Sequence, residues 1–333
     1  MIVLGIESTA HTFGIGIVKD GKIVANAKKA YTTESGGIIP TDAARFHQQN
    51  KEEIFFEALE AAGIKEGSID AIAVSQGPGL APCLLQGMSF AKSLATRLGK
   101  PIVPVNHCVA HLEVGRLTGA KDPVMLYASG ANTQIIAYSS GKFRVFGETL
   151  DIGIGNFIDT FARYAGIGFP GGPRIEKLAQ EDKEKNLVRL PYKVKGMDIS
   201  LSGILTNLKQ KLGSGEYRLP DLAFSLQEQV FAMLVEVSER ALAHTGKKEL
   251  LLGGGVACNK RLQAMCKTMC EDRGAKFFCP ENSLLTDNGA MIAYLGFLMF
   301  RAGIKAQGKE LKELDIKPRQ RTDDIEVTWR TLL

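Results

Sequence analysis

The chain has 333 residues, of which 45% are hydrophobic and 23% charged, with 41 Lys and Arg against 36 Asp and Glu. This composition excludes a disordered or fibrous protein and indicates a globular chain long enough for two lobes. No apolar run reaches the roughly 18 residues that a membrane span needs, so we expect no membrane insertion. The formal charge of +5 permits a nucleic-acid partner without requiring one.

The six cysteines show neither a CxxC pair nor the spacing of a secreted disulfide framework. No signal peptide precedes the strand-like start, so we expect reduced thiols and a cytoplasmic location. Cys266 and Cys270 lie four residues apart on a predicted helix and could bind a metal ion. Because no histidine is nearby, the favoured interpretation is that both are small buried apolar residues.

The first hundred residues are predicted to be rich in strands. Apolar strands are expected at 2–5, at 13–18 and from Ile23, with a tight turn at Asp20-Gly21-Lys22 between the last two. A later strand at 71–80 has a glycine-rich exit and leads into a helix at 81–98.

The second half repeats this plan. Strands are predicted at 124–129, 134–138 and 143–148, and the strand at 249–259 again ends in glycines before a helix at 260–271. Repetition on this scale indicates a duplicated mixed α/β lobe and not a solenoid. An apolar helix is then expected at 289–301, followed by a charged, irregular tail.

Two of the five histidines, His107 and His111, lie four residues apart in the segment NHCVAHLEVGR. If this segment is helical, both imidazoles lie on one face and can reach one metal ion, although surface histidines have the same spacing. The residues between them include no glutamate, so the general base of an HExxH metallopeptidase is missing. Two histidines also leave the ligand set incomplete, so further ligands must come from elsewhere in the chain.

Glycine-rich turns follow several predicted strands. Backbone N–H groups in such turns, and at helix N-termini, can bind phosphate, although a single turn of this kind is a weak signal. None has the spacing of a Walker A loop or a convincing dinucleotide motif. Together, on a duplicated lobe, they favour a nucleotide in the cleft between lobes. The turns are 129–133, 153–155, 166–172 and 253–255.

Motifs along nearly the whole chain resemble the universal tRNA threonylcarbamoyladenosine transferase family, formerly labelled O-sialoglycoprotein endopeptidases. The similarity is closest to the archaeal and eukaryotic branch, the catalytic subunit of the KEOPS assembly. The motifs are GIESTAHT at 5–12, GGIIPTDAARFH at 36–47, SQGPGLAPCLLQG at 75–87, NHCVAHLEVGR at 106–116, YASGANTQ at 127–134, DIGIGNFIDTFAR at 151–163, GFPGGPRIEKLA at 168–179, SLSGILTNLK at 200–209, GGGVACNKRL at 253–262 and TDNGAMIA at 286–293.

The resemblance implies an α/β, two-lobed actin/Hsp70/sugar-kinase fold (ASKHA) with duplicated RNase H-like lobes. The expected first lobe covers 1–105, with a C-terminal helix from about residue 290 packing back on it. The second lobe covers 106–333 and places the metal and nucleotide site in the cleft.

Site residues follow from the same resemblance. Tyr127 and Asp287 would join the two histidines around one Fe or Zn ion, a choice that this ligand set leaves open. ATP or threonylcarbamoyl-AMP, with Mg as a further option for the nucleotide, would bind to residues from both halves of the second lobe. These residues are Tyr127, Ala128, Ser129, Gly130, Ala131, Asn132, Asp159, Gly172, Glu176 and Asn259.

The implied reaction is metal-dependent transfer of threonylcarbamoyl from threonylcarbamoyl-AMP to N6 of adenosine 37 in tRNAs that decode ANN codons. No residue stands out as the base for the N6 proton; Glu7 and His11, at the first turn, are candidates for a catalytic or a structural role. Lys28, Lys29, Lys51, Lys193 and Lys195 are candidates for tRNA contact or for a solvated surface.

The expected partners are the tRNA anticodon loop, a separate kinase/ATPase and small accessory KEOPS subunits, and an enzyme that forms the adenylate. Three other readings stay open: an ATP-driven scaffold or switch without acyl transfer, a metallopeptidase, and a sugar or acetate kinase. The missing glutamate argues against the peptidase, and such kinases have no need of the histidine pair.

Overall fold

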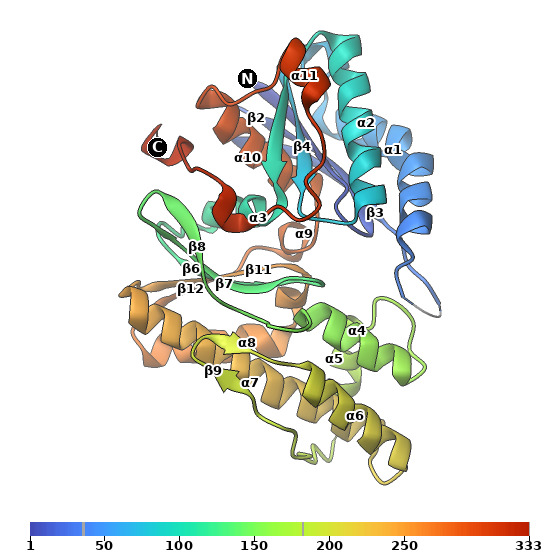
Figure 1. Ribbon diagram of the computed structural model, residues 1–333, viewed down its shortest axis with the longest axis vertical. Coiled ribbons are helices and arrows are strands. Elements are labelled where there is room, and N and C mark those ends of the chain that lie inside the picture. The colour runs from blue at the N-terminus through green and yellow to red at the C-terminus, as the bar shows by residue number, and fades with distance from the viewer. Residues whose placement is uncertain (35–36, 182, 333) are drawn as a thin grey trace.

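The computed structural model describes residues 1–34, 37–181 and 183–332, and its centre is a pair of five-stranded sheets (Figure 1). The first sheet has the order β3-β2-β1-β4-β5. Its first three strands are antiparallel, whereas β4 and β5 join parallel to β1 and to each other. The strands are β1 (Ile2–Glu7), β2 (Thr12–Lys19), β3 (Lys22–Ala30), β4 (Ala71–Gly77) and β5 (Ile102–Asn106).

The second sheet repeats this topology, with the order β12-β11-β6-β7-β8. Again three antiparallel strands are followed by two parallel ones. The predicted duplication of an α/β lobe is therefore confirmed. The strands are β6 (Val124–Ala128), β7 (Thr133–Ser139), β8 (Lys142–Glu148), β11 (Glu249–Gly253) and β12 (Lys276–Phe278); a small separate ribbon comprises β9 (Val194–Lys195) and β10 (Asp198–Ile199).

Both lobes use the same hairpin turn. Asp20 and Gly21 connect β2 to β3 with φ values of 50° and 81°, and Ser140 and Gly141 connect β7 to β8 with 52° and 81°. Positive φ at both central residues matches the right-handed twist of the flanking strands. The Asp-Gly turn predicted from the sequence is therefore a true hairpin turn, and its counterpart is the Ser-Gly turn.

Helices form three layers around the sheets. The outer face of the first sheet packs on α1 (Pro40–Ala62) and α2 (Ala81–Leu98), while α3 (His107–Gly115) and α10 (Gly289–Arg301) lie between the sheets (Figure 1). The outer face of the second sheet packs on a third group of helices. These are α4 (Ile154–Tyr164), α5 (Gly172–Glu181), α6 (Ser202–Ser214), α7 (Leu219–Thr245) and α8 (Lys260–Asp272); α9 (Asn282–Leu285) and α11 (Lys309–Glu313) are short.

The middle layer contains the functional segments. Helix α10 packs directly on the backbone of β1 and β2, since a Cβ on Gly5 or Gly16 would lie 2.1 Å from a backbone nitrogen of the helix. Only glycine permits this approach. The helix from about residue 290 thus packs on the first sheet, while the lobe boundary at 105/106 remains a prediction.

The C-terminal strap, defined as residues 315–330, crosses both sheets. Lys317 N donates to Gln76 O (2.7 Å) near the end of β4, and Thr322 Oγ1 donates to Gln134 Oε1 (3.4 Å) on β7. At its end, Trp329 is only 1% exposed. The sequence predicted an irregular tail, and the strap does contain little regular structure; its order comes from tertiary contacts that composition does not reveal.

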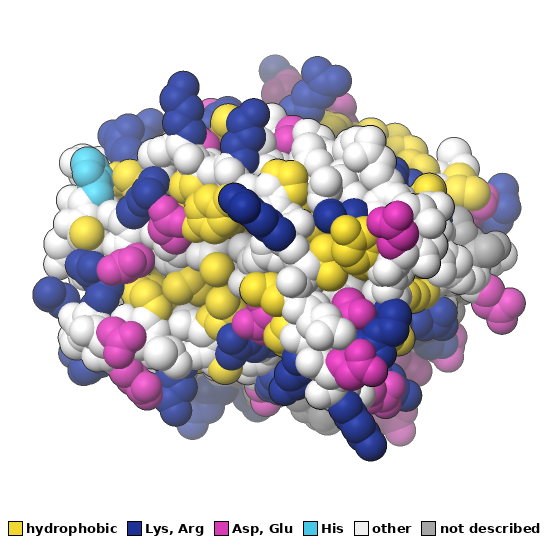
Figure 2. Space-filling view, turned by 90° about the horizontal axis from the view of Figure 1, so that it is seen from below, with side chains coloured by type: hydrophobic (Ala, Val, Ile, Leu, Met, Phe, Trp, Pro, Cys, Tyr) yellow, Lys and Arg dark blue, Asp and Glu magenta, His cyan; other side chains and the backbone are white. Residues whose placement is uncertain are grey.

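The remaining composition-based predictions concern cysteines and membranes. Cys83, Cys108, Cys266 and Cys270 are buried, and all six cysteines are free thiols. None of the described helices is both long and apolar enough to cross a membrane. The end of the molecule below the second sheet carries Lys and Arg interspersed with Asp and Glu (Figure 2), so this face offers no uniformly cationic surface among its described residues.

Candidate metal centre and nucleotide site

The two histidines of the NHCVAHLEVGR segment begin a buried helix between the sheets. Asn106 caps α3, because its side chain accepts a hydrogen bond from Val109 N (3.1 Å). His107 therefore occupies the first helical position, and His111 follows one turn later on the same face. The predicted geometry of the pair is confirmed by the helix.

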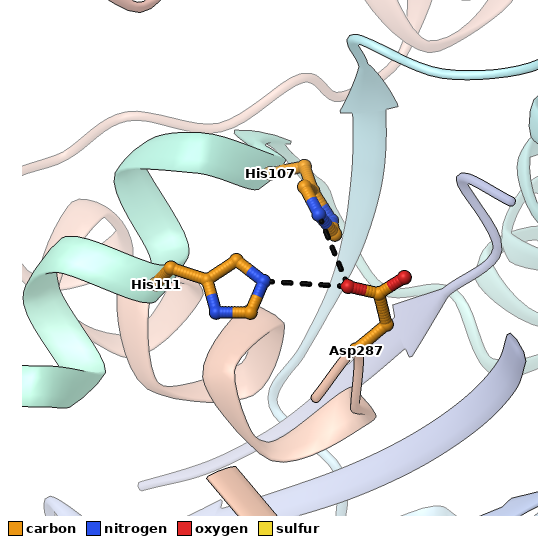
Figure 3. Close-up of side chains that lie close together, drawn as sticks. All are labelled: His107, His111 and Asp287. Atoms are coloured by element: carbon orange, nitrogen blue, oxygen red, sulfur yellow. Dashed lines mark hydrogen bonds and ion pairs between the residues drawn. The ribbon is translucent and has the colours of Figure 1, made fainter. Parts of the chain in front are cut away.

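Asp287 completes a three-residue cluster from the segment between α9 and α10. One ligand atom from each of His107, His111 and Asp287 lies within 4.8 Å of the others. Nε2 of each histidine lies 3.4 Å from Asp287 Oδ1 (Figure 3). Among the described residues, these are the only three His, Cys, Asp or Glu side chains that converge in this way.

Electrostatics favour an ionised carboxylate at this point. Burial alone would raise the pKa of Asp287, but the charges and hydrogen bonds of His107 and His111 hold it well below its usual range. Burial lowers the pKa of His111, which keeps that imidazole available as a neutral ligand. Two imidazole nitrogens and one carboxylate oxygen that already converge fit a transition-metal ion with open coordination positions.

Glu7 fixes the orientation of His107. Its Oε2 accepts a 2.9 Å hydrogen bond from His107 Nδ1, and its Oε1 accepts bonds from Thr9 N (2.6 Å) and Thr9 Oγ1 (2.5 Å). A carboxylate on one ring nitrogen turns the other toward the metal position, as in the carboxylate–histidine arrangement of metal sites. Burial opposes protonation of His107, but Glu7 and Asp287 raise its pKa well above the ordinary value.

Tyr127 lies beside His111 at the end of β6. Its ring centroid is 5.2 Å from that of His111, and its side chain is 1% exposed. Burial, together with the nearby charges of Cys108 and Asp287, raises the pKa of the phenol well above its usual value. The structure therefore places Tyr127 next to the cluster, while its role as a fourth ligand remains a prediction.

The predicted phosphate turn, Ala128 to Asn132, directly follows Tyr127. Ser129 N and Ser129 Oγ both bond to Asn132 O, at 3.0 and 2.9 Å, which closes the turn. Gly155 N, near the start of α4, donates to Ser129 O (3.0 Å). Gly254 approaches from β11, with φ of 89° and a hypothetical Cβ only 2.5 Å from Ala128 O. Several of the predicted glycine turns thus converge on one place.

Three expected nucleotide contacts surround the start of α8. Glu176 Oε1 accepts from Lys260 N (2.8 Å), and Asn259 Oδ1 caps the helix by accepting from Arg261 N and Leu262 N. Asn259 Nδ2 also donates to Gln227 Oε1 (2.6 Å). Gly172 begins α5, one helical turn before Glu176. These residues are close together, and their side chains also hold α5 to α8.

Asp159 and His11 are neighbours on the first-lobe side of this region. Asp159 Oδ1 accepts from Gly171 N (2.8 Å), and burial raises the pKa of its carboxyl group. The His11 ring lies edge-on to Phe169 at 5.3 Å, two residues before the Gly171 that donates to Asp159. His11 therefore lies near a predicted ribose contact, whereas Glu7 lies on the metal side.

Sequence reasoning missed two charged residues around the cluster. Glu113, on α3, is fully buried, and Lys28 reaches from β3 to the segment that carries Asp287. Glu113 lies six residues after His107 in the motif, but nothing local indicates its partners. Lys28 was expected on a solvated or tRNA-facing surface; it is only partly exposed, because its ammonium group is bonded to residues 283–287, and tRNA contact stays a prediction.

Comparison with solved structures identifies the class of fold. HypF of T. kodakarensis matches 90% of this chain and 48% of its own, with a TM-score of 0.62 and 13% identity. This likeness shows the fold alone. Together with the duplicated sheets, it defines a two-lobed α/β protein of the actin/Hsp70/sugar-kinase class, as predicted.

Sequence comparison identifies the family. A family model described as tRNA N6-adenosine threonylcarbamoyltransferase matches residues 22–294. Proteins of that name from Thermococcus sibiricus and Bos taurus are 56% and 48% identical, covering 99% and 98% of this chain and 100% and 99% of their own. A Thermoplasma volcanium protein named probable bifunctional tRNA threonylcarbamoyladenosine biosynthesis protein is 51% identical over 99% of this chain and 62% of its own. The chain belongs to the tRNA N6-adenosine threonylcarbamoyltransferase family.

Proposed function

We propose that this protein transfers a threonylcarbamoyl group from threonylcarbamoyl-AMP to N6 of adenosine 37 in ANN-decoding tRNA. The observation that carries the proposal is the convergence of His107, His111 and Asp287 within a chain of this family. In the reaction, a bond forms between N6 and the carbamoyl carbon. The bond from that carbon to the phosphate oxygen breaks, and AMP leaves with the electron pair.

We assign one Fe or Zn ion to His107, His111 and Asp287, with Tyr127 as the fourth protein ligand. Such an ion supplies Lewis-acid polarisation of the acyl group when bound. The protein's own contribution is to hold this ligand set rigid: Glu7 orients His107, and α10 fixes Asp287 against the first sheet. Glu7 fits a positioning role better than that of a base, because both of its oxygens already accept hydrogen bonds.

We place the adenylate between the metal ligands and the start of α8. The turn at Ser129 to Asn132 would face its phosphate with backbone amides, and Asp159, Glu176 and Asn259 would hold its adenosine. The target adenine must leave the anticodon-loop stack, which a single-stranded loop permits at modest cost. His11, near Asp159, remains our candidate for the N6 proton.

The wider assignment extends to partners and place of action. We infer that the chain works in the cytoplasm as the catalytic subunit of a KEOPS-type complex, with a separate kinase/ATPase, small accessory subunits and an adenylate-forming enzyme. We also retain the division into lobes at 105/106. A peptidase is disfavoured, since Glu7, the carboxylate that contacts His107 besides the assigned ligand Asp287, is bonded to His107 and Thr9.

The test is a reconstitution with the candidate partners, threonine, bicarbonate, ATP and an ANN-decoding tRNA, followed by nucleoside mass spectrometry. Wild-type protein should produce threonylcarbamoyladenosine, and His111→Ala should produce none and lose its metal while staying folded. His244→Ala, which changes an exposed histidine of α7, is the matched control and should keep full activity. Activity of metal-depleted His111→Ala would refute the metal mechanism, and no product from the complete wild-type assembly would favour a scaffold.

A further inference from the structure

Lys28 connects the first sheet to the segment that carries the metal ligand Asp287. Its ammonium group donates to Thr286 Oγ1 (2.6 Å), Ser283 O (3.1 Å) and Asp287 O (3.1 Å). Asn26, two residues earlier and therefore on the same face of β3, donates to Ser283 O (3.4 Å) and accepts from Ala290 N (3.3 Å). Strand β3 thus holds the chain on both sides of Asp287.

Among the described residues, no carboxylate oxygen contacts the ammonium group of Lys28. All three of its hydrogen bonds end on uncharged oxygens, and within the described chain it forms no ion pair. Lys28 is only partly exposed. A partly buried cation without a contacting anion is costly to maintain, which points to an anion that arrives from outside the chain.

The position of Lys28 indicates which anion this is. The segment that it holds includes α9, which packs against the 3-10 turn Gly255–Cys258 immediately before Asn259. Lys28 donates to Ser283 O within α9 and to Asp287 O at the metal cluster. Its ammonium group therefore lies between the metal ligands and the residues expected to hold adenosine. In an acyl adenylate, the group between the acyl carbon and the adenosine is the phosphate.

Resting on the function proposed above, we propose that Lys28 supplies the positive charge beside the phosphate of threonylcarbamoyl-AMP. When the carbon–oxygen bond breaks, the electron pair stays on the phosphate oxygen and the phosphate gains one negative charge. A cation already fixed at this place stabilises the product side of that step more than the substrate. The field of the ammonium group, and not a free N–H, performs this role, since its three hydrogens remain bonded to 283–287.

The test compares AMP with adenosine, which differ only in the phosphate, by calorimetry on metal-free protein. Lys28→Met should weaken AMP binding about tenfold, because one positive charge near the phosphate is lost, and leave adenosine binding unchanged. Lys28→Arg should restore most of the preference for AMP. Lys22→Met, on an exposed lysine at the start of the same strand, is the matched control and should bind both ligands as the wild type does.

Equal loss of AMP and adenosine, or no preference for AMP in the wild type, would overturn the proposal. Cobalt binding provides a second readout. If Lys28→Met loses cobalt affinity but keeps its preference for AMP, Lys28 only supports the position of Asp287, and the proposal is refuted. Because neither measurement requires tRNA, failure of transfer in the reconstitution would reject the proposed function separately.

Discussion

The indole of Trp329 donates a 3.0 Å hydrogen bond to Oε1 of Glu113, which lies 216 residues earlier on the helix that carries both histidines. The same oxygen accepts from Arg330 Nε (2.9 Å), and Glu113 Oε2 accepts from Arg116 Nη1 (2.9 Å). The guanidinium of Arg330 also lies over the ring of Tyr138, at 4.5 Å. One buried carboxylate therefore joins the C-terminal strap to the metal helix.

Replacing this carboxylate should destabilise the protein. Glu113→Ala leaves two arginines and an indole without their partner, and loss of one member of a buried charge network costs about 3 kcal/mol. We expect the free energy of unfolding in urea to fall by about that amount, and cobalt affinity to fall because α3 loses its anchor. Glu310→Ala, on the exposed surface of α11, should change neither quantity. An unchanged urea midpoint in Glu113→Ala would show that the strap does not hold the helix.

The contrast between Glu113 and the histidine pair shows what the sequence could predict. His107 and His111 are four residues apart, so helical periodicity alone places them on one face. Asp287 lies 176 residues from His111, and no local sequence pattern connects the two. Only the family resemblance indicated that Asp287 belongs to the same site. Glu113 and Trp329 are even further apart, at 216 residues, and neither the composition nor the periodicity of the strap predicts that Trp329 has a buried partner. Strands and turns were predictable because their signals are local, whereas contacts between lobes depend on how two sheets stack.

The pH dependence of stability should include a clear contribution from His47. Burial lowers the pKa of this imidazole, which packs against Phe13 and Phe46, to about 4. In the unfolded chain its pKa is about 6.5, so between these values the unfolded state binds the extra proton. The contribution of neutral, buried His47 to the free energy of unfolding is therefore fully present above pH 6.5. It is lost as the pH falls toward 4, and the loss amounts to about 3 kcal/mol.

Urea unfolding of the wild type and of His47→Phe at several pH values tests this contribution. The variant lacks the titrating group, so its stability should fall less steeply between pH 6.5 and 4; carboxylates contribute equally to both proteins. His244→Phe, at an exposed position, should keep the wild-type slope. Parallel curves for the wild type and His47→Phe would mean that His47 titrates normally in the folded state.

The contact between α10 and the first sheet should not tolerate an added methyl group. A Cβ at Gly16 would lie 2.1 Å from Ala290 N, a backbone atom that cannot rotate away as a side chain could. Gly16→Ala should therefore push α10 outward, lower the free energy of unfolding by about 3 kcal/mol, and weaken metal binding through displacement of Asp287. The control is Gly203→Ala on α6, where a Cβ meets open space; a gain of up to about 1 kcal/mol is expected there. Equal stability of the two variants would contradict the close packing.

The role of Glu7 can be separated from that of a catalytic base. Glu7→Gln keeps the size of the side chain, but its amide cannot accept at both ends, so the bond from His107 Nδ1 or those from Thr9 are weakened. Loss of such an orienting carboxylate typically lowers metal affinity 10- to 100-fold, and we expect a loss of about that size in a cobalt titration. The exposed Glu53→Gln, which removes only a surface ion pair with Lys29, should bind cobalt normally. If Glu7 were instead the base, Glu7→Gln would keep its metal affinity and lose transfer at saturating metal; that combination would reject the positioning role.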